Sequence, residues 1–125
     1  MRVGVYVKAS LFVSGKKLKK KKTTTSSMRP TTMNAVWNEA LVFTSLSRQQ
    51  LQTCTRLELV LHQGHHGDAV GKVTVGCDKD IGEEEIRHWT DMLSGRPAVA
   101  KWHQLNPLTV TASSSCSQIT ETNMK

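Results

Sequence analysis

The sequence predicts an all-β protein: an antiparallel β-sandwich with one helix inserted between its late strands. Apolar residues alternate with a period of two over several short segments that turns separate. Only residues 83–93 show the three- and four-residue spacing of a longer helix. Strands joined by short turns favour an antiparallel sheet, and 125 residues, 38% of them hydrophobic, suffice for one domain.

The first predicted strand covers residues 3–13, where every second residue is apolar. Ser14 and Gly15 supply a turn, so the lysine-rich residues 16–22 become the second strand of a hairpin. Residues 26–35 are polar and form a predicted loop. Further strands are predicted over residues 35–43, 56–61, 69–75 and 101–105.

Two segments between these strands have helical features. Residues 45–53 are expected to form a short helical turn capped by Ser47. Residues 83–93 begin with three glutamates, which complement the positive end of a helix dipole. Gly95 and Pro97 then end this helix.

The chain is expected to divide into a domain over residues 1–105 and a Ser/Thr-rich disordered tail over residues 106–125. No run reaches the ~18 apolar residues that a membrane-spanning helix needs, and the alternating start is unlike an apolar secretory signal. The widely spaced Cys54, Cys77 and Cys116 favour reduced thiols in a cytoplasmic protein.

The charge distribution predicts an anionic partner. The net charge is +7, and residues 1–38 hold nine basic side chains and no acidic one. Nine of the ten acidic residues follow residue 57. Phospholipid headgroups, nucleic acid and an acidic protein surface are all partners that such a positive block could attract.

Catalytic and metal-binding motifs find little support. The sequence lacks the nucleophile elbow, the phosphate-binding loop and the zinc-protease motif, so we expect neither enzymatic activity nor a cofactor. His62, His65 and His66 share a Gly-rich loop and could ligate zinc. Because no cysteine lies near them, solvent-exposed loop histidines are the preferred interpretation.

Six short motifs follow one another from about residue 4 to residue 105. They are Tyr6-Val7-Lys8, the basic residues 15–24, N-A-V-W-N-E at 34–39, A-V-G-K-V at 69–73, R-H-W-T-D-M-L at 87–93 and W-H-Q-L at 102–105. In this order they resemble the second, C-terminal C2 domain of the synaptotagmin family. The resemblance implies a C2-type sandwich of about eight strands, and the two strands expected before Tyr6 make this chain an amino-terminally truncated domain.

The resemblance also implies that the calcium site is degenerate. Calcium-binding C2 domains use about five aspartates on two loops, because Ca²⁺ takes six to eight oxygen ligands. Here Gly4 replaces one aspartate, and His62-Gln63-Gly64 stands where the family has D-x-D. Of the expected ligands only Asp68 remains, so we expect no calcium binding.

The lysine run is the main candidate binding site. The resemblance implies that it binds acidic phospholipids, above all phosphoinositides, and acidic faces of SNARE or adaptor proteins. Strict alternation puts Lys17, Lys19 and Lys21 on one face of the strand. The other face receives Lys16, Lys20, Lys22 and Leu18, and Lys8 and Arg29 could extend the patch.

Two further sites follow from the resemblance. Arg96 stands where the family has an arginine pair that contacts membranes or SNARE proteins. Trp102, His103 and Leu105 belong to a motif linked to docking, although packing at the end of the sandwich is the preferred role for Trp102 and Leu105. Trp89 is expected in the core, together with Ile86 and Leu93.

The sequence thus predicts a calcium-independent interaction module in vesicle trafficking and exocytosis, cytoplasmic and peripheral on membranes. A basic nucleic-acid-binding domain is the alternative, with Tyr6 and Phe12 as the only aromatic residues near the lysines. A poorly folded fragment without independent function is another. The lysines could also serve only to protect an edge strand from pairing with other chains.

Overall fold

The computed structural model of the chain describes residues 3–28, 34–64, 66–95, 98–108 and 121–124. The strands are β1 (Val3–Val13), β2 (Lys16–Lys22), β3 (Ser26–Met28), β4 (Thr55–Gln63), β5 (Asp68–Gly76), β6 (Lys101–Gln104), β7 (Asn106–Pro107) and β8 (Glu121–Met124). The helices are α1 (Arg48–Gln52) and α2 (Glu83–Leu93). The predicted all-β class, with a helix between late strands, is confirmed.

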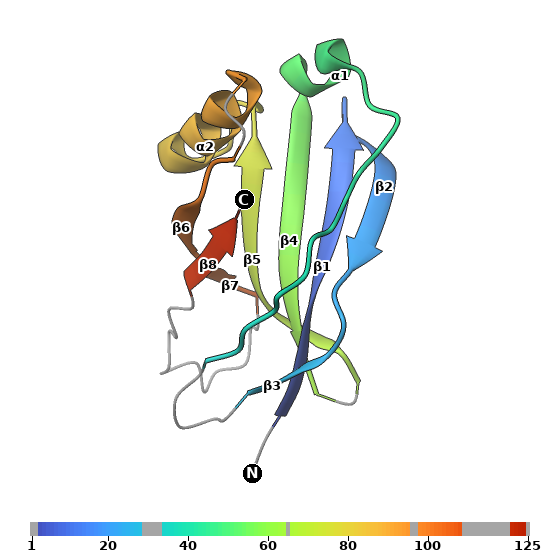
Figure 1. The fold of residues 1–125 in the computed structure, drawn as a ribbon, viewed down its shortest axis with the longest axis vertical. Coiled ribbons are helices and arrows are strands. Elements are labelled where there is room, and N and C mark those ends of the chain that lie inside the picture. Colours follow the sequence, from blue (N-terminus) through green and yellow to red (C-terminus); the bar gives the residue numbers. More distant parts are fainter. Residues whose placement is uncertain (1–2, 29–33, 65, 96–97, 109–120, 125) are drawn as a thin grey trace.

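One sheet dominates the molecule (Figure 1). Its strand order is β2-β1-β4-β5-β7, and β3 pairs with the beginning of β1. A second, two-stranded sheet joins β6 to β8. All of these pairings are antiparallel, so the predicted hairpin of residues 3–22 is present.

The alternation in β1 has the predicted consequence. Val5, Ala9 and Leu11 are at most 2% exposed and face the core, as does the half-buried Val7, whereas Tyr6 and Lys8 point to the other face. Ser14 and Gly15 both adopt positive φ, 52° and 80°, and reverse the chain into β2. Gly15 adopts this conformation without the steric cost that a Cβ atom brings.

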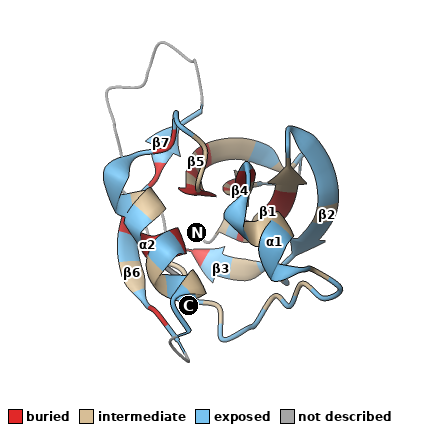
Figure 2. Ribbon diagram, turned by 90° about the horizontal axis from the view of Figure 1, so that it is seen from above, coloured by how far each residue is buried: buried red, intermediate tan, exposed pale blue. Residues whose placement is uncertain are grey.

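The core consists of two apolar clusters on one face of the main sheet, and Figure 2 shows buried positions of β1, β4 and β5 in red. The larger cluster joins β1, β4 and β5 to Met28 and Leu105. The smaller one is built on Leu11, Val75 and Trp89. Trp89 also donates its indole N–H to the carbonyl of Leu51 at 2.9 Å, which ties α2 to α1.

Residues 34–46 form no strand, so the strand predicted over residues 35–43 is wrong. The segment crosses the core face of the main sheet as an irregular chain (Figure 1). Its apolar side chains still pack on the core, through Ala35, Trp37, Leu41 and Phe43. Strand formation also requires a neighbour that shares backbone hydrogen bonds, and the described residues provide none here.

Both predicted helical segments are confirmed. Ser47 caps α1 in a capping box with Gln50: the Ser47 hydroxyl accepts from the Gln50 amide and the Gln50 side chain accepts from the Ser47 amide. The bounds of α2 are those predicted, with Glu83, Glu84 and Glu85 in the first turn. Among the described residues, no helix is long and apolar enough to cross a bilayer.

Two short strands, β7 and β8, fall within residues 106–125, the predicted disordered tail. Asn106 and Pro107 pair with Lys72 and Gly71 of β5, and β8 pairs with β6. Few of these residues are apolar, so the composition pointed to disorder, but backbone hydrogen bonds to an available strand edge do not require apolar side chains. Residues 109–120 lie outside the described part of the chain, and a domain boundary at residue 105 stays a prediction.

Candidate functional site

The lysine run forms β2, an edge strand that pairs with β1. This pairing contains a β-bulge: Leu11 lies opposite Lys19, whereas Phe12 lies opposite Lys17. Leu18 is therefore the extra residue. An inserted residue turns the side chains beyond it to the other face of a sheet.

The bulge corrects the predicted division of the lysines between two faces. The structure places Lys17, Lys20 and Lys22 together on the face away from the core, and Lys16, Lys19 and Lys21 on the other. Strict alternation had instead grouped Lys17 with Lys19 and Lys21. It had placed Lys16 with Lys20 and Lys22. It failed because lysines lie on both sides of Leu18, so no contrast between apolar and polar residues reveals the bulge.

Aromatic rings lie among the lysines on the face away from the core. The Lys17 ammonium lies over the Phe12 ring, 5.6 Å from its centroid, and that of Lys22 lies 5.8 Å from the centroid of Tyr6. Lys8 lies opposite Lys22 across the β1–β2 ladder and belongs to the same face. We call Lys8, Lys17, Lys20 and Lys22 the outer basic face.

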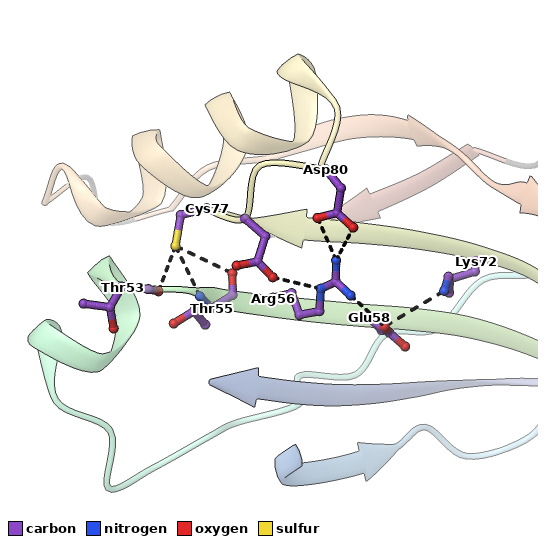
Figure 3. A network of polar contacts seen from close by, with 8 residues as sticks. Thr53, Thr55, Arg56, Glu58, Lys72, Cys77 and Asp80 are labelled. Carbon is purple, nitrogen blue, oxygen red and sulfur yellow. Dashed lines mark hydrogen bonds and ion pairs between the residues drawn. The ribbon is translucent and has the colours of Figure 1, made fainter. Parts of the chain in front are cut away.

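The lysines of β2 have no carboxylate within 4.0 Å among the side chains that the structure describes. Three of the ten carboxylates of the sequence contact Arg56 instead, near the start of β4 and just beyond the end of β5 (Figure 3). Arg56 there contacts Asp80 at 2.8 Å, Asp78 at 3.1 Å and Glu58 at 3.9 Å. The positive charge of β2 is thus left available to an external anion.

The contact between Arg56 and Asp80 shifts the pKa of both groups. Arg56 Nη2 donates to both carboxylate oxygens of Asp80, and this hydrogen bond lowers the pKa of Asp80. The same bond raises the pKa of Arg56. Arg56 and the carboxylates around it therefore form ion pairs with one another.

The backbone that follows β2 is held by hydrogen bonds from Thr24 to Glu39 and from Trp37 to Thr24. We call these contacts the clamp; the sequence did not predict them. Both the backbone N–H and the hydroxyl of Thr24 donate to the carboxylate of Glu39, the N–H at 3.1 Å. The indole N–H of Trp37 donates to the carbonyl of Thr24 at 2.9 Å. Trp37 and Glu39 lie in the 34–39 motif, which was the only sequence signal near them.

The predicted calcium region lies where β1 begins and β4 ends. The amide of Gly64 donates to the carbonyl of Gly4 at 3.0 Å, and His62 Nδ1 donates to the carbonyl of Gly67 at 2.8 Å. Asp68 is exposed there. No group of three or more potential metal-ligating side chains occurs in the described part of the chain, which omits His65.

The other predicted site residues are dispersed. Trp102 is 65% exposed, so its predicted packing role is wrong, because alternation along β6 turns it away from the buried His103. His103 and Leu105 are 4% and 6% exposed, so Trp102 is the exposed one of the three predicted docking residues. Arg29 and Arg96 lie outside the described residues.

A buried histidine pair joins α2 to β6. His88 Nε2 donates to the carbonyl of Val99 at 3.2 Å, so His88 Nδ1 accepts from His103 Nε2 at 2.7 Å. Glu85 lies 3.8 Å from His103 Nδ1. Burial, followed by the charge of His88, lowers the pKa of His103, although Glu85 opposes the shift.

The buried His103 should make stability depend on pH. A lowered pKa in the folded state means that the unfolded chain takes up the proton first. The free energy of unfolding should therefore fall as the pH drops below about 6.5, the ordinary value for histidine. Urea denaturation at pH 7.5, 6.5 and 5.5 measures this, and His103→Gln should flatten the profile while the exposed His66→Gln should not. Equal slopes in both variants would contradict this assignment.

Comparison with known proteins identifies the family to which the chain belongs. A family model described as the C2 domain matches residues 2–92. This match covers most of the chain. The protein therefore belongs to the C2 domain family.

Within that family the chain is similar to synaptotagmins, as the motifs predicted. It is 41% identical over 105 residues to Synaptotagmin-A of Diplobatis ommata, covering 82% of this chain and 23% of that protein. It is 39% identical over 105 residues to Synaptotagmin-2 of Homo sapiens, with coverages of 82% and 24%. The chain spans about a quarter of the length of these relatives. Its assignment to the second of their C2 domains stays a prediction.

Proposed function

We propose that this chain is a non-enzymatic, calcium-independent module, cytoplasmic and peripheral on membranes or vesicles. It binds acidic phospholipids, above all phosphoinositides, in vesicle trafficking and exocytosis. The outer basic face is the proposed binding surface. Acidic faces of SNARE or adaptor proteins are competing partners for the same charges.

The observation that carries this proposal is the lack of internal carboxylate partners for the lysines of β2 within the described residues. A lysine near an anionic bilayer contributes about 1 kcal/mol, and the attraction fades within a Debye length. The four lysines of the outer basic face would together supply roughly 4 kcal/mol. This is enough for reversible attachment and is sensitive to salt.

The aromatic residues favour lipid over nucleic acid. Single-stranded nucleic acid is usually held by bases stacked on free aromatic faces. Here Lys17 lies over Phe12 and Lys22 lies over Tyr6. His62 also stacks on Tyr6, with ring centroids 4.9 Å apart. These contacts leave little aromatic surface for a base.

Calcium independence is proposed from the ligands near the loop that joins β4 to β5. Of residues 62–68, Asp68 is the only one with a carboxylate. A single carboxylate is far short of the six to eight oxygen ligands that Ca²⁺ takes. Attachment through the outer basic face should thus be the same with calcium as with a chelator.

Vesicle binding tests the proposed function. Cosedimentation with phosphatidylcholine vesicles containing phosphatidylinositol 4,5-bisphosphate should show binding that weakens steeply from 0.05 to about 0.5 M salt. Replacing Lys17, Lys20 and Lys22 together with Glu should weaken it at least roughly 100-fold, since three favourable terms of about 1 kcal/mol are lost. Calcium and a chelator should give the same isotherm.

The matched control reverses the same number of charges on the other face of β2. Replacing Lys16, Lys19 and Lys21 with Glu should weaken vesicle binding clearly less. Equal losses in the two triple variants would contradict the outer basic face as the binding surface. Tighter binding to single-stranded DNA than to vesicles at the same salt would contradict the lipid proposal, and a calcium-dependent isotherm would contradict calcium independence.

A further inference from the structure

The short link between β2 and β3 has the features of a regulatory modification site. Residues 23–25 separate the last lysine of β2 from Ser26 and form no regular secondary structure. Thr24 and Thr25 are both exposed. Four consecutive lysines, residues 19–22, directly precede the link, and charge patterns of this kind are what kinases use to choose substrates.

We propose that Thr24 is a phosphorylation site for a kinase directed by basic residues, and that its phosphate regulates the outer basic face. The Thr24 hydroxyl oxygen attacks the γ-phosphorus of ATP, the bond to the β-phosphate breaks, ADP leaves and the hydroxyl proton is released. The effect on lipid binding rests on the proposed function above.

The neighbours of the link distinguish Thr24 from Thr23. Thr23 is half-buried, and its hydroxyl accepts from the amide of Val7 and donates to the carbonyl of Thr24, both at 2.9 Å. Its oxygen is therefore occupied within the fold. The Thr24 hydroxyl is bonded only to Glu39 among the described residues, and it becomes free whenever that exposed contact opens.

Phosphorylation should break the clamp on the chain that leaves β2. A phosphorylated oxygen has no hydrogen to donate to Glu39, and the phosphate adds about −1.5 to −2 charges beside that carboxylate. The repulsion displaces Glu39 from Thr24, whose carbonyl also accepts from Trp37. One modification thus adds negative charge beside the lysines and releases the segment that crosses the core face of the sheet.

The change in charge predicts a measurable loss of lipid binding. Phosphorylation within a basic cluster is a general way to release it from anionic membranes. Cancelling about two positive charges should weaken attachment to the phosphoinositide vesicles roughly thirtyfold. The indole N–H resonance of Trp37 should shift in the same protein, because its acceptor carbonyl moves.

The site is tested by treating the full chain with ATP and the catalytic domain of a serine/threonine kinase that requires preceding basic residues. Mass spectrometry should locate the phosphate on Thr24. Thr24→Ala should abolish this labelling and Thr25→Ala should retain it. Failure to label the chain, or labelling at Thr25 alone, would overturn the proposal.

The consequence is tested with phosphothreonine incorporated at position 24, and at position 25 as a matched control. Both proteins should bind phosphoinositide vesicles less tightly, but only the phosphate at 24 should shift the Trp37 indole resonance. Unchanged binding and an unchanged resonance at 24 would overturn the regulatory role. If the unmodified chain binds no vesicles, the proposed function fails, while kinase labelling and the Trp37 resonance still decide the modification and the clamp.

Discussion

Replacing Trp89 with alanine is expected to destabilise the protein by roughly 3–5 kcal/mol. Trp89 is 5% exposed and lies in the smaller core cluster with Leu11 and Val75. Its indole N–H donates to the carbonyl of Leu51 at 2.9 Å. The substitution leaves a large cavity and removes the hydrogen bond that ties α2 to α1. Urea denaturation followed by circular dichroism measures the loss.

Trp102 provides the matched control for this substitution. It is 65% exposed on β6, and Trp102→Ala should change the free energy of unfolding by no more than about 0.5 kcal/mol. Trp89→Phe retains a large ring but not the N–H donor, so it should cost less than Trp89→Ala. Similar losses for Trp89→Ala and Trp102→Ala would show that the two core clusters are wrongly assigned.

These two tryptophans show what the sequence could predict. In α2 the helical spacing placed Trp89 on the core face, and the structure agrees. In β6 the rare W-H-Q-L motif suggested packing for Trp102, whereas the period of two along the strand puts His103 inside. Four residues are too few for alternation to settle which set faces inward without knowledge of the neighbouring elements.

The same contrast applies to the binding site. Alternation predicted β1 because apolar and polar residues differ there, but no such contrast exists among the lysines of β2. The bulge at Leu18 therefore could not be foreseen, although it decides which lysines share a face. The link between Thr24 and Glu39 spans 15 residues of sequence and depends on how residues 34–46 cross the sheet.

Pairing partners account for the other differences. The apolar residues of 35–43 were correctly expected to favour burial, yet a strand needs backbone partners that the local sequence does not specify. Short polar segments such as β7 and β8 pair because an edge of another strand is available to them. Strand propensity describes the preference of a single residue, whereas a ladder of backbone hydrogen bonds depends on both paired strands.

Replacing Gly76 with alanine is the second substitution with a large expected effect, at least about 3 kcal/mol. Gly76 has a φ of 153°, and a Cβ atom there would lie 2.1 Å from the carbonyl oxygen of Thr55. That oxygen accepts from the amide of Cys77 at 2.9 Å, and Thr55 is fully buried. The clash must therefore move the backbone where β4 begins and β5 ends.

Gly15→Ala separates this clash from the cost of backbone conformation alone. Gly15 has a φ of 80°, and a Cβ atom there would meet no atom within 4 Å. It should cost only about 1 kcal/mol, because an L-residue is disfavoured at positive φ even without a steric contact. Thermal and urea denaturation of both variants compare the two effects. A Gly76→Ala variant that lost no more stability than Gly15→Ala would contradict this prediction. It would mean that the β4–β5 junction can relax around a methyl group and that the close packing of Gly76 against Thr55 does not constrain the fold.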